Sequence, residues 1–403
     1  MEERENNRLS VYPQLYYRWA FVHFWLVAAV GLVLRTHYLW PFQDFKVPHW
    51  LHAHSHVAFL GWIFFVLIGA MLRYFPEFLA FTRRQQQWLF YLLLLSVWGM
   101  LFTFIWQGYG LFSITFSTLH MALGIWIAIR FFKKSRGNSQ LSVQMMRWAL
   151  IFMLLSSAGP LVLGPLSAMG LKTSKWYQLS IYFYLHFQYN GWFTLAILAL
   201  LFRKTPVHGA AANQKMLLYG AVVGIAMTYS LSALGYQIHW IWFVIGGAGA
   251  LLQLWAVGTW VKKWWKSTNR RKNPRQWIIK TALFFLLIKL VIQCLSALPA
   301  VVDLTYYQRD MVVAYLHLVL LGFASAAGMY IVFMEQSHLR NVMVYWWVFL
   351  GALVVMEAVL VVKSYFFVIP GLYSDYLLWL TALGLFAAVT ILTIKYLLKP
   401  TSY

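Results

Sequence analysis

The sequence predicts an all-α integral membrane protein with twelve transmembrane helices. Hydrophobic residues make up 62% of the 403-residue chain and charged residues 10%, a composition too apolar for a soluble protein. Apolar stretches long enough to cross a bilayer recur along the whole chain and leave almost no sequence for a soluble domain. We therefore expect a single membrane domain over residues 1–403, with spans at about 16–35, 51–73, 88–107, 111–132, 147–168, 177–202, 215–235, 239–260, 276–299, 311–334, 342–367 and 376–398.

A short pattern recurs in the second, sixth and tenth spans. His56, His186 and His317 lie 130 and 131 residues apart, and each is followed five residues later by glycine and then by an aromatic residue. Equal spacing of one motif indicates an internal repeat. We therefore expect three pseudo-equivalent four-helix units, at about 1–140, 141–272 and 273–403, with the three histidines at comparable depth. The glycines of the pattern are Gly61, Gly191 and Gly322.

The charge pattern predicts the topology. The chain has a formal net charge of +22, and most of its 32 Lys and Arg residues fall in alternate loops. Such a bias places the basic loops and both termini in the cytoplasm, so the charge is a topology signal and we expect no nucleic-acid partner. The expected location is a bacterial cytoplasmic membrane, with the lipid bilayer as the main partner. The one cysteine, Cys294, lies within an expected span, which excludes a disulfide framework and cysteine-based metal sites.

Histidines cluster at the start of the second span. His52 and His56 are one helical turn apart and share a face, whereas His54 and His56 project about 200° apart. Imidazole is costly in hydrocarbon, so several such rings at one end of a span require a reason. Two neighbours that face opposite ways cannot easily serve one metal, but they can serve two. His120, in the outer half of the fourth span, adds a further imidazole.

Neutral imidazoles at equivalent depth on several helices are what axial haem ligation or a histidine metal site requires. We expect one or two haem groups of the b type, because no C-x-x-C-H segment exists for covalent attachment. The candidate haem-binding residues are His54, His56 and His317 together with Gly61, Gly191 and Gly322. The candidate metal ligands are His52, His54, His56, His120, His186 and His317.

Other polar residues in the spans have a less specific interpretation. Glu357 is the only acid well inside a span, and it either handles protons or pairs with a basic neighbour such as Lys289. Tyr189 is a second proton-handling candidate. The proline-rich fifth span, with Pro160 and Pro165, is expected to kink or unwind. The remaining histidines near span ends, in loops or standing alone are interpreted as structural: His23, His37, His208, His239 and His338.

Two short motifs carry a family resemblance. The segment 54–62, HSHVAFLGW, resembles the H-x-H motif of the catalytic subunit of haem–copper oxidases and nitric oxide reductases. Residues 50–54, WLHAH, with Gly61-Trp62 and the later Pro76, also resemble the NnrS family, haem-containing twelve-span proteins linked to nitric oxide tolerance. The first alignment uses His54 and His56, and the second uses His52 and His54.

The resemblance implies three arcs of four helices around haem, with redox chemistry or binding of a diatomic gas, nitric oxide first. It also implies a possible second metal (copper or non-haem iron) and a cytochrome c, quinol or respiratory subunit as electron donor. His186 matches the oxidase histidine of helix 6, and Tyr189 lies near the place of an oxidase tyrosine. The chain departs from the pattern, because H-x-H lies on helix 2 instead of helix 10 and helix 7 contains no histidine.

The standard binuclear centre therefore cannot form, and conventional proton-pumping oxygen reduction is not expected. The activity expected first is that of an oxidoreductase of the cytochrome oxidase or nitric oxide reductase type. Two other classes stay open: a proton-coupled transporter, and a non-catalytic membrane assembly or tolerance factor.

Overall fold

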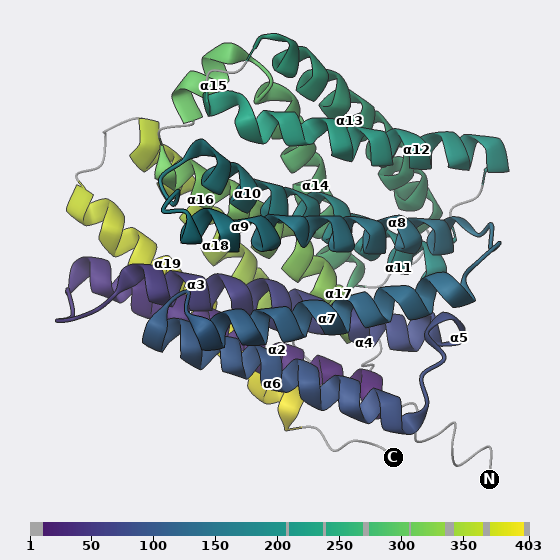
Figure 1. Ribbon diagram of the computed structural model, residues 1–403, viewed down its shortest axis with the longest axis horizontal. Coiled ribbons are helices and arrows are strands. Elements are labelled where there is room, and N and C mark those ends of the chain that lie inside the picture. Colours follow the sequence, from purple (N-terminus) through teal and green to yellow (C-terminus); the bar gives the residue numbers. More distant parts are fainter. Residues whose placement is uncertain are drawn as a thin grey trace. The chain divides into compact units, whose positions relative to one another are not determined.

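The computed structural model describes residues 11–206, 209–236, 239–268, 274–305, 308–334, 342–365 and 371–398. Within these ranges every regular element is a helix (Figure 1). Twelve of the described helices are long and apolar enough to cross a membrane, and they coincide with the twelve expected spans. The all-α, multi-pass membrane class is thereby confirmed. The grouping into three four-helix units stays a prediction.

The chain divides into two compact units. Unit 1 comprises residues 1–127 and 328–403, and unit 2 comprises residues 128–327. Unit 1 contains α2 (Val11–Leu39), α3 (Val47–His56), η1 (Val57–Ile63), α4 (Phe64–Tyr74), α5 (Pro76–Leu79), α6 (Arg83–Gln107), most of α7 (Leu111–Lys134), most of α17 (Ala326–Phe333), α18 (Val342–Tyr365) and α19 (Gly371–Leu397).

Unit 1 joins the two ends of the chain. Helix α2 packs against α19, α4 and η1. At one end of α2 the Arg18 guanidinium donates to the carbonyl of Leu397 at 2.7 Å, and near the other end the Trp379 indole N–H donates to the Thr36 hydroxyl at 3.0 Å. On another side of α2, Phe24 stacks on Trp62 with ring centroids 4.3 Å apart. Because the α2 pairing is fixed at both ends, the position of η1 beside it is also fixed.

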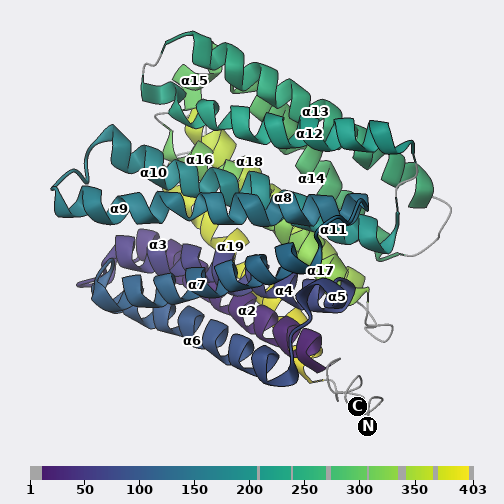
Figure 2. The same ribbon diagram turned by 45° about the vertical axis from the view of Figure 1, so that its right-hand side comes forward.

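Unit 2 contains the central part of the chain, drawn in teal and green in Figure 2. Its elements are α8 (Leu141–Ser156), α9 (Ala158–Ala168), α10 (Lys175–His186), η2 (Phe187–Phe193), α11 (Thr194–Lys204), α12 (Ala211–Met227), η3 (Thr228–Tyr236), α13 (Ile241–Thr268), α14 (Gln276–Leu295), α15 (Pro299–Thr305), α16 (Arg309–His317) and η4 (Leu318–Ser325).

The fifth span is broken at Ser157, between α8 and α9. Pro160 lies just beyond the break, and a proline ring has no N–H to bond the carbonyl four residues earlier. The predicted kink is therefore confirmed, and it lies one turn before the first proline.

Three helical segments of the π type each begin directly after one of the in-register histidines. His56 precedes η1, His186 precedes η2 and His317 precedes η4. Helices of this type are rare, occur mostly as single turns inside α-helices and are frequent at functional sites. The three spans that contain them are also the most buried of the described spans, with 83%, 94% and 78% of their central residues buried against at most 56% for the others. The local geometry therefore repeats with the sequence motif.

The glycine of each motif lies where a neighbouring helix approaches. An added methyl group at Gly61 would lie 3.0 Å from His23 and equally close to Val97. At Gly191 it would lie 2.5 Å from Phe152, and at Gly322 it would lie 3.0 Å from Phe285. His23, Phe152 and Phe285 come from α2, α8 and α14, the helices that pack against η1, η2 and η4. A Cβ would therefore collide with its neighbour at Gly191, and at Gly61 and Gly322 it would crowd the adjacent ring.

We expect Gly191→Ala to destabilise the protein by about 1–3 kcal/mol, because its methyl group would collide with the fixed root of the Phe152 side chain. The control is Gly258→Ala in α13, where an added methyl group meets nothing within 4 Å. That variant should be neutral or stabilised by about 0.5–1 kcal/mol. Melting temperatures in detergent test both, and equal stability of the two variants would contradict the close contact.

Candidate functional site

The histidines of α3 point to two different helices. The His54 ring hydrogen-bonds to the backbone of Val27 and lies against Gly31, where an added methyl group would be 3.1 Å from its Cε1 atom. His52 and His56 instead face α6 and the turn after it, with ring centroids 4.6 Å from Tyr109 and 4.2 Å from Phe104 respectively. The predicted arrangement is confirmed: His52 and His56 share a face, and His54 points to another side.

Hydrogen bonding determines which nitrogen of His56 is available. Its Nδ1 lies 2.9 Å from the carbonyl oxygen of His52, one turn earlier in α3. Since a carbonyl can only accept, Nδ1 carries the proton and Nε2 keeps its lone pair. Metal-ligating histidines are oriented in this way, with one ring N–H donated to a backbone carbonyl.

Two further rings in unit 1 have the same tautomer. His23 of α2 donates from Nδ1 to the carbonyl of Gly61 at 3.1 Å, and His120 of α7 donates from Nδ1 to the hydroxyl of Ser96 at 3.0 Å. The Ser96 hydroxyl donates its own hydrogen bond to the carbonyl of Leu93 at 2.7 Å. Toward His120 this hydroxyl is therefore the acceptor. In both rings Nε2 is buried and has no hydrogen-bond partner.

The three imidazoles lie in one part of unit 1. His56 and His23 are the ionisable side chains that interact electrostatically with His120. Aromatic rings of α4 lie against two of them, with the ring centroid of Phe64 4.6 Å from that of His120 and the centroid of Phe65 4.8 Å from that of His23. Among the residues that the structure describes, no group of three or more His, Cys, Asp or Glu side chains is placed to hold a metal ion. The predicted second metal therefore stays a prediction.

In unit 2, both nitrogens of His186 are engaged. Nε2 donates to the carbonyl of Ile225 at 2.8 Å, and Nδ1 accepts from the Asn190 side-chain amide at 3.0 Å. Ligation through His186 would require one of these bonds to break. Tyr189 lies in the same segment, with its ring centroid 6.2 Å from that of Tyr315.

His317 closes α16 at the start of η4, also in unit 2. The expected pairing of His317 with His54 or His56 joins residues of different units and stays a prediction.

The two interior charged residues have different neighbours. Glu357 interacts electrostatically with Arg35, and both belong to unit 1. Glu357 therefore has a basic neighbour, as one of its two interpretations expects. That neighbour is Arg35, whereas the sequence analysis names Lys289 as an example. Lys289 is 1% exposed, its Nζ has no hydrogen-bond partner, and His186 and Cys294 are the ionisable side chains that interact with it.

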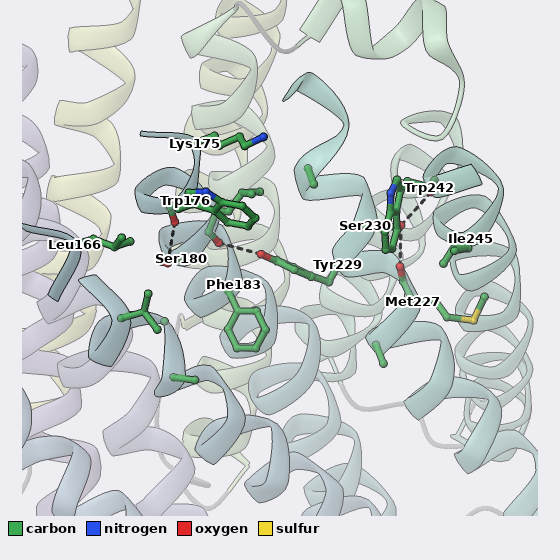
Figure 3. A pocket seen from close by; sticks show the side chains of 16 residues that line it. Leu166, Lys175, Trp176, Ser180, Phe183, Met227, Tyr229, Ser230, Trp242 and Ile245 are labelled. Carbon is green, nitrogen blue, oxygen red and sulfur yellow. Dashed lines mark hydrogen bonds between the residues drawn. The ribbon is translucent and has the colours of Figure 1, made fainter. Parts of the chain in front are cut away.

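Unit 2 also contains an apolar groove of about 760 Å³ between α9, α10 and the start of α13 (Figure 3). Tyr229 extends across it, and its hydroxyl donates to the carbonyl of Leu179 at 3.1 Å. Ser180 and Ser230 likewise donate to backbone carbonyls of Trp176 and Met227. The hydroxyl protons are therefore used within the protein, and the groove offers a ligand an apolar wall with hydroxyl oxygens as acceptors.

His23 is the residue whose place the sequence did not reveal. The sequence interprets it as structural, and its hydrogen bond to the Gly61 carbonyl agrees with that interpretation. The contact itself is visible only in the structure, where His23, Phe152 and Phe285 each lie against one motif glycine. His37 and His239 accept hydrogen bonds from the backbone N–H groups of Phe42 and Ile241, which agrees with their structural interpretation. His208 and His338 lie outside the described residues.

No protein-family model matches this sequence, and no curated protein matches it either. The function of the site is therefore argued from its own geometry.

We expect Lys289→Met to raise the melting temperature, because a buried ammonium without a partner costs free energy that a thioether of similar length does not. The gain should be about 1–3 kcal/mol. Lys280→Met is the control. The Lys280 ammonium lies 5.1 and 5.4 Å from the ring centroids of Trp265 and Trp277, so this variant loses two cation–π contacts and should gain no stability. A Lys289→Met variant less stable than the parent would show that this ammonium has a stabilising partner.

Proposed function

We propose that this protein binds haem within its membrane-spanning helices and uses it for redox chemistry or for binding a diatomic gas, nitric oxide first. The observation that carries the proposal is the hydrogen bond from His56 Nδ1 to the carbonyl of His52 at 2.9 Å. It leaves Nε2 as an oriented electron-pair donor, which is what an axial haem ligand must be.

The hydrogen bonds of His54 and His56 also support one of the two family alignments over the other. His54 is bonded to the α2 backbone, and its remaining nitrogen, Nδ1, is buried against Gly31. Nδ1 is bonded to Cγ, the ring carbon that is attached to Cβ. The backbone side of the residue therefore hinders the approach of a macrocycle to Nδ1. His56 is therefore the preferred ligand on this helix, which favours the reductase-like alignment over the NnrS-like one.

The residues around His56 support this role. Phe104 lies against the ring at 4.2 Å, and Tyr109 lies at 6.1 Å. These rings exclude water from one side of the imidazole and restrict its rotation. A bound haem would supply an iron centre that exchanges single electrons or coordinates a gas molecule. The protein's contribution is the position, tautomer and apolar surroundings of the ligand.

The proposed setting is a bacterial cytoplasmic membrane with both termini inside, supported by the distribution of Lys and Arg. A cytochrome c, a quinol or another respiratory subunit would deliver electrons. A second candidate, a transporter of an apolar substrate, is favoured by the groove beside the break at Ser157. The spectroscopic experiment below separates the two.

Purified protein from haem-replete cells should show a Soret band of b-type haem, and His56→Ala should remove or shift it. The reason is loss of the oriented Nε2 donor. His37→Ala serves as the control, because His37 lies at the end of α2, where it accepts a hydrogen bond from the Phe42 N–H and stacks on Phe45. A colourless protein that takes up no haem on reconstitution, or an unchanged spectrum in His56→Ala, would refute the assignment.

The reduced protein should form an adduct with carbon monoxide or nitric oxide while consuming little oxygen. Gas binding needs one haem with an open coordination position, whereas four-electron oxygen reduction needs a nearby metal, and the seventh span, Ala211–Leu234, provides no histidine for one. Difference spectra and an oxygen electrode measure the two properties. Rapid, cyanide-sensitive oxygen uptake with a reduced quinol or cytochrome would contradict this expectation.

A further inference from the structure

We propose that the apolar groove of unit 2 holds one acyl chain of an anionic phospholipid, with the headgroup phosphate of that lipid beside the Lys175 ammonium. The groove lies between α9, α10, the end of α12 with η3, and the start of α13 (Figure 3), and all of its lining residues belong to unit 2. None of them is a proposed haem ligand, so this site does not depend on the haem assignment.

One end of the groove lies at a membrane face. Consecutive spans cross a bilayer in opposite directions, so the sixth span, Lys175–Lys204, and the eighth, Ile241–Thr268, begin on the same face. Trp176 and Trp242, in the first turns of these spans, line the groove and are 60% and 42% exposed. Indole rings gather where the hydrocarbon core meets the headgroups. This end of the groove is therefore at the level of the lipid headgroups.

The interior of the groove suits hydrocarbon. Val162 and Phe183 line it with carbon alone. The hydroxyl groups of Ser180, Tyr229 and Ser230 already donate hydrogen bonds to backbone carbonyls. A carbonyl or carboxylate group that entered here would lose its hydrogen bonds to water and would find no hydroxyl donor in exchange. An acyl chain meets no such penalty.

The length of the groove matches one leaflet of a bilayer. Along α10 the lining residues run from Lys175 to Phe183, a distance of about 12 Å at the helical rise of about 1.5 Å per residue. Half of the hydrocarbon core of a bilayer is about 15 Å thick. The groove therefore follows most of one leaflet and ends short of the midplane, which is the course of a single acyl chain.

The charge at the membrane face selects the headgroup. Among the described residues that line the groove, Lys175 alone carries a charge. It is the first residue of α10, and its Nζ lies 5.5 Å from the ring centroid of Trp176. The ammonium is therefore held beside the interfacial indole, at the depth of lipid phosphates. A cation at the mouth of an apolar groove is complementary to an amphiphile with an anionic head and a hydrocarbon tail.

The test is native mass spectrometry of the delipidated, full-length protein, titrated with phosphatidylglycerol or phosphatidylcholine of identical acyl chains. We expect the parent to bind one phosphatidylglycerol about fivefold more tightly than phosphatidylcholine. Lys175→Gln should abolish that preference, because it removes the charge. Ala226→Phe places a ring in the groove and displaces part of the acyl chain, so it should weaken the binding of both lipids by more than about tenfold.

Two matched variants distinguish this site from the general lipid layer around the protein. Lys172→Gln removes a lysine three residues before Lys175 that does not line the groove. Val223→Phe adds the same ring to α12 at an exposed position outside the groove. Both variants should bind the two lipids as the parent does.

Equal affinity of the parent for the two lipids would overturn the proposal. A preference that survives in Lys175→Gln, or unchanged lipid binding in Ala226→Phe, would do the same. A short-chain quinol that binds more tightly than phosphatidylglycerol and is lost in Ala226→Phe would assign the groove to an electron donor and would also overturn it. Lys175 and Ala226 are exposed, and size-exclusion profiles with melting temperatures check that their variants are folded. The absence of a Soret band would leave the lipid result unaffected, so the two proposals can fail separately.

Discussion

Inside a bilayer there is no water to accept a hydrogen bond from an imidazole N–H. Every buried ring must therefore find its hydrogen-bond acceptor within the protein. In unit 1 this requirement is met by fixed backbone and hydroxyl oxygens at Gly61, His52 and Ser96. Each of these oxygens accepts a hydrogen bond from a ring Nδ1–H. It thereby fixes the orientation of the ring and the direction of the lone pair on Nε2. The chemistry that these helices can support follows from where their own carbonyl groups lie.

The fold was largely readable from the sequence. Span length, composition and charge bias depend on the bilayer as a solvent, which acts on every residue of a helix at once, so all twelve spans were found. The break near Pro160 was also predictable, because the missing N–H of proline acts locally. The opposite orientation of His54 and His56 followed from helical periodicity alone.

The candidate site was only partly readable. Helical periodicity gives the direction of a side chain but not the identity of the atom it meets, so the hydrogen bonds that fix His56 and that occupy both nitrogens of His186 could not be foreseen. The hydrogen bond of His23 could not be foreseen either, because its acceptor, the Gly61 carbonyl, is 38 positions away in the chain. The neighbours of Glu357 and Lys289 depended on which helices pack together, and residue spacing does not contain that information.

The segments η1, η2 and η4 have a consequence for how these helices tolerate change in length. A π-helical turn accommodates one more residue than an α-helical turn without altering the faces that the flanking helix presents. The helical parts before and after each π segment can therefore keep their faces when one residue is removed from the π-helical turn. We expect a single-residue deletion in η1, η2 or η4 to be absorbed more readily than a deletion elsewhere in the same spans.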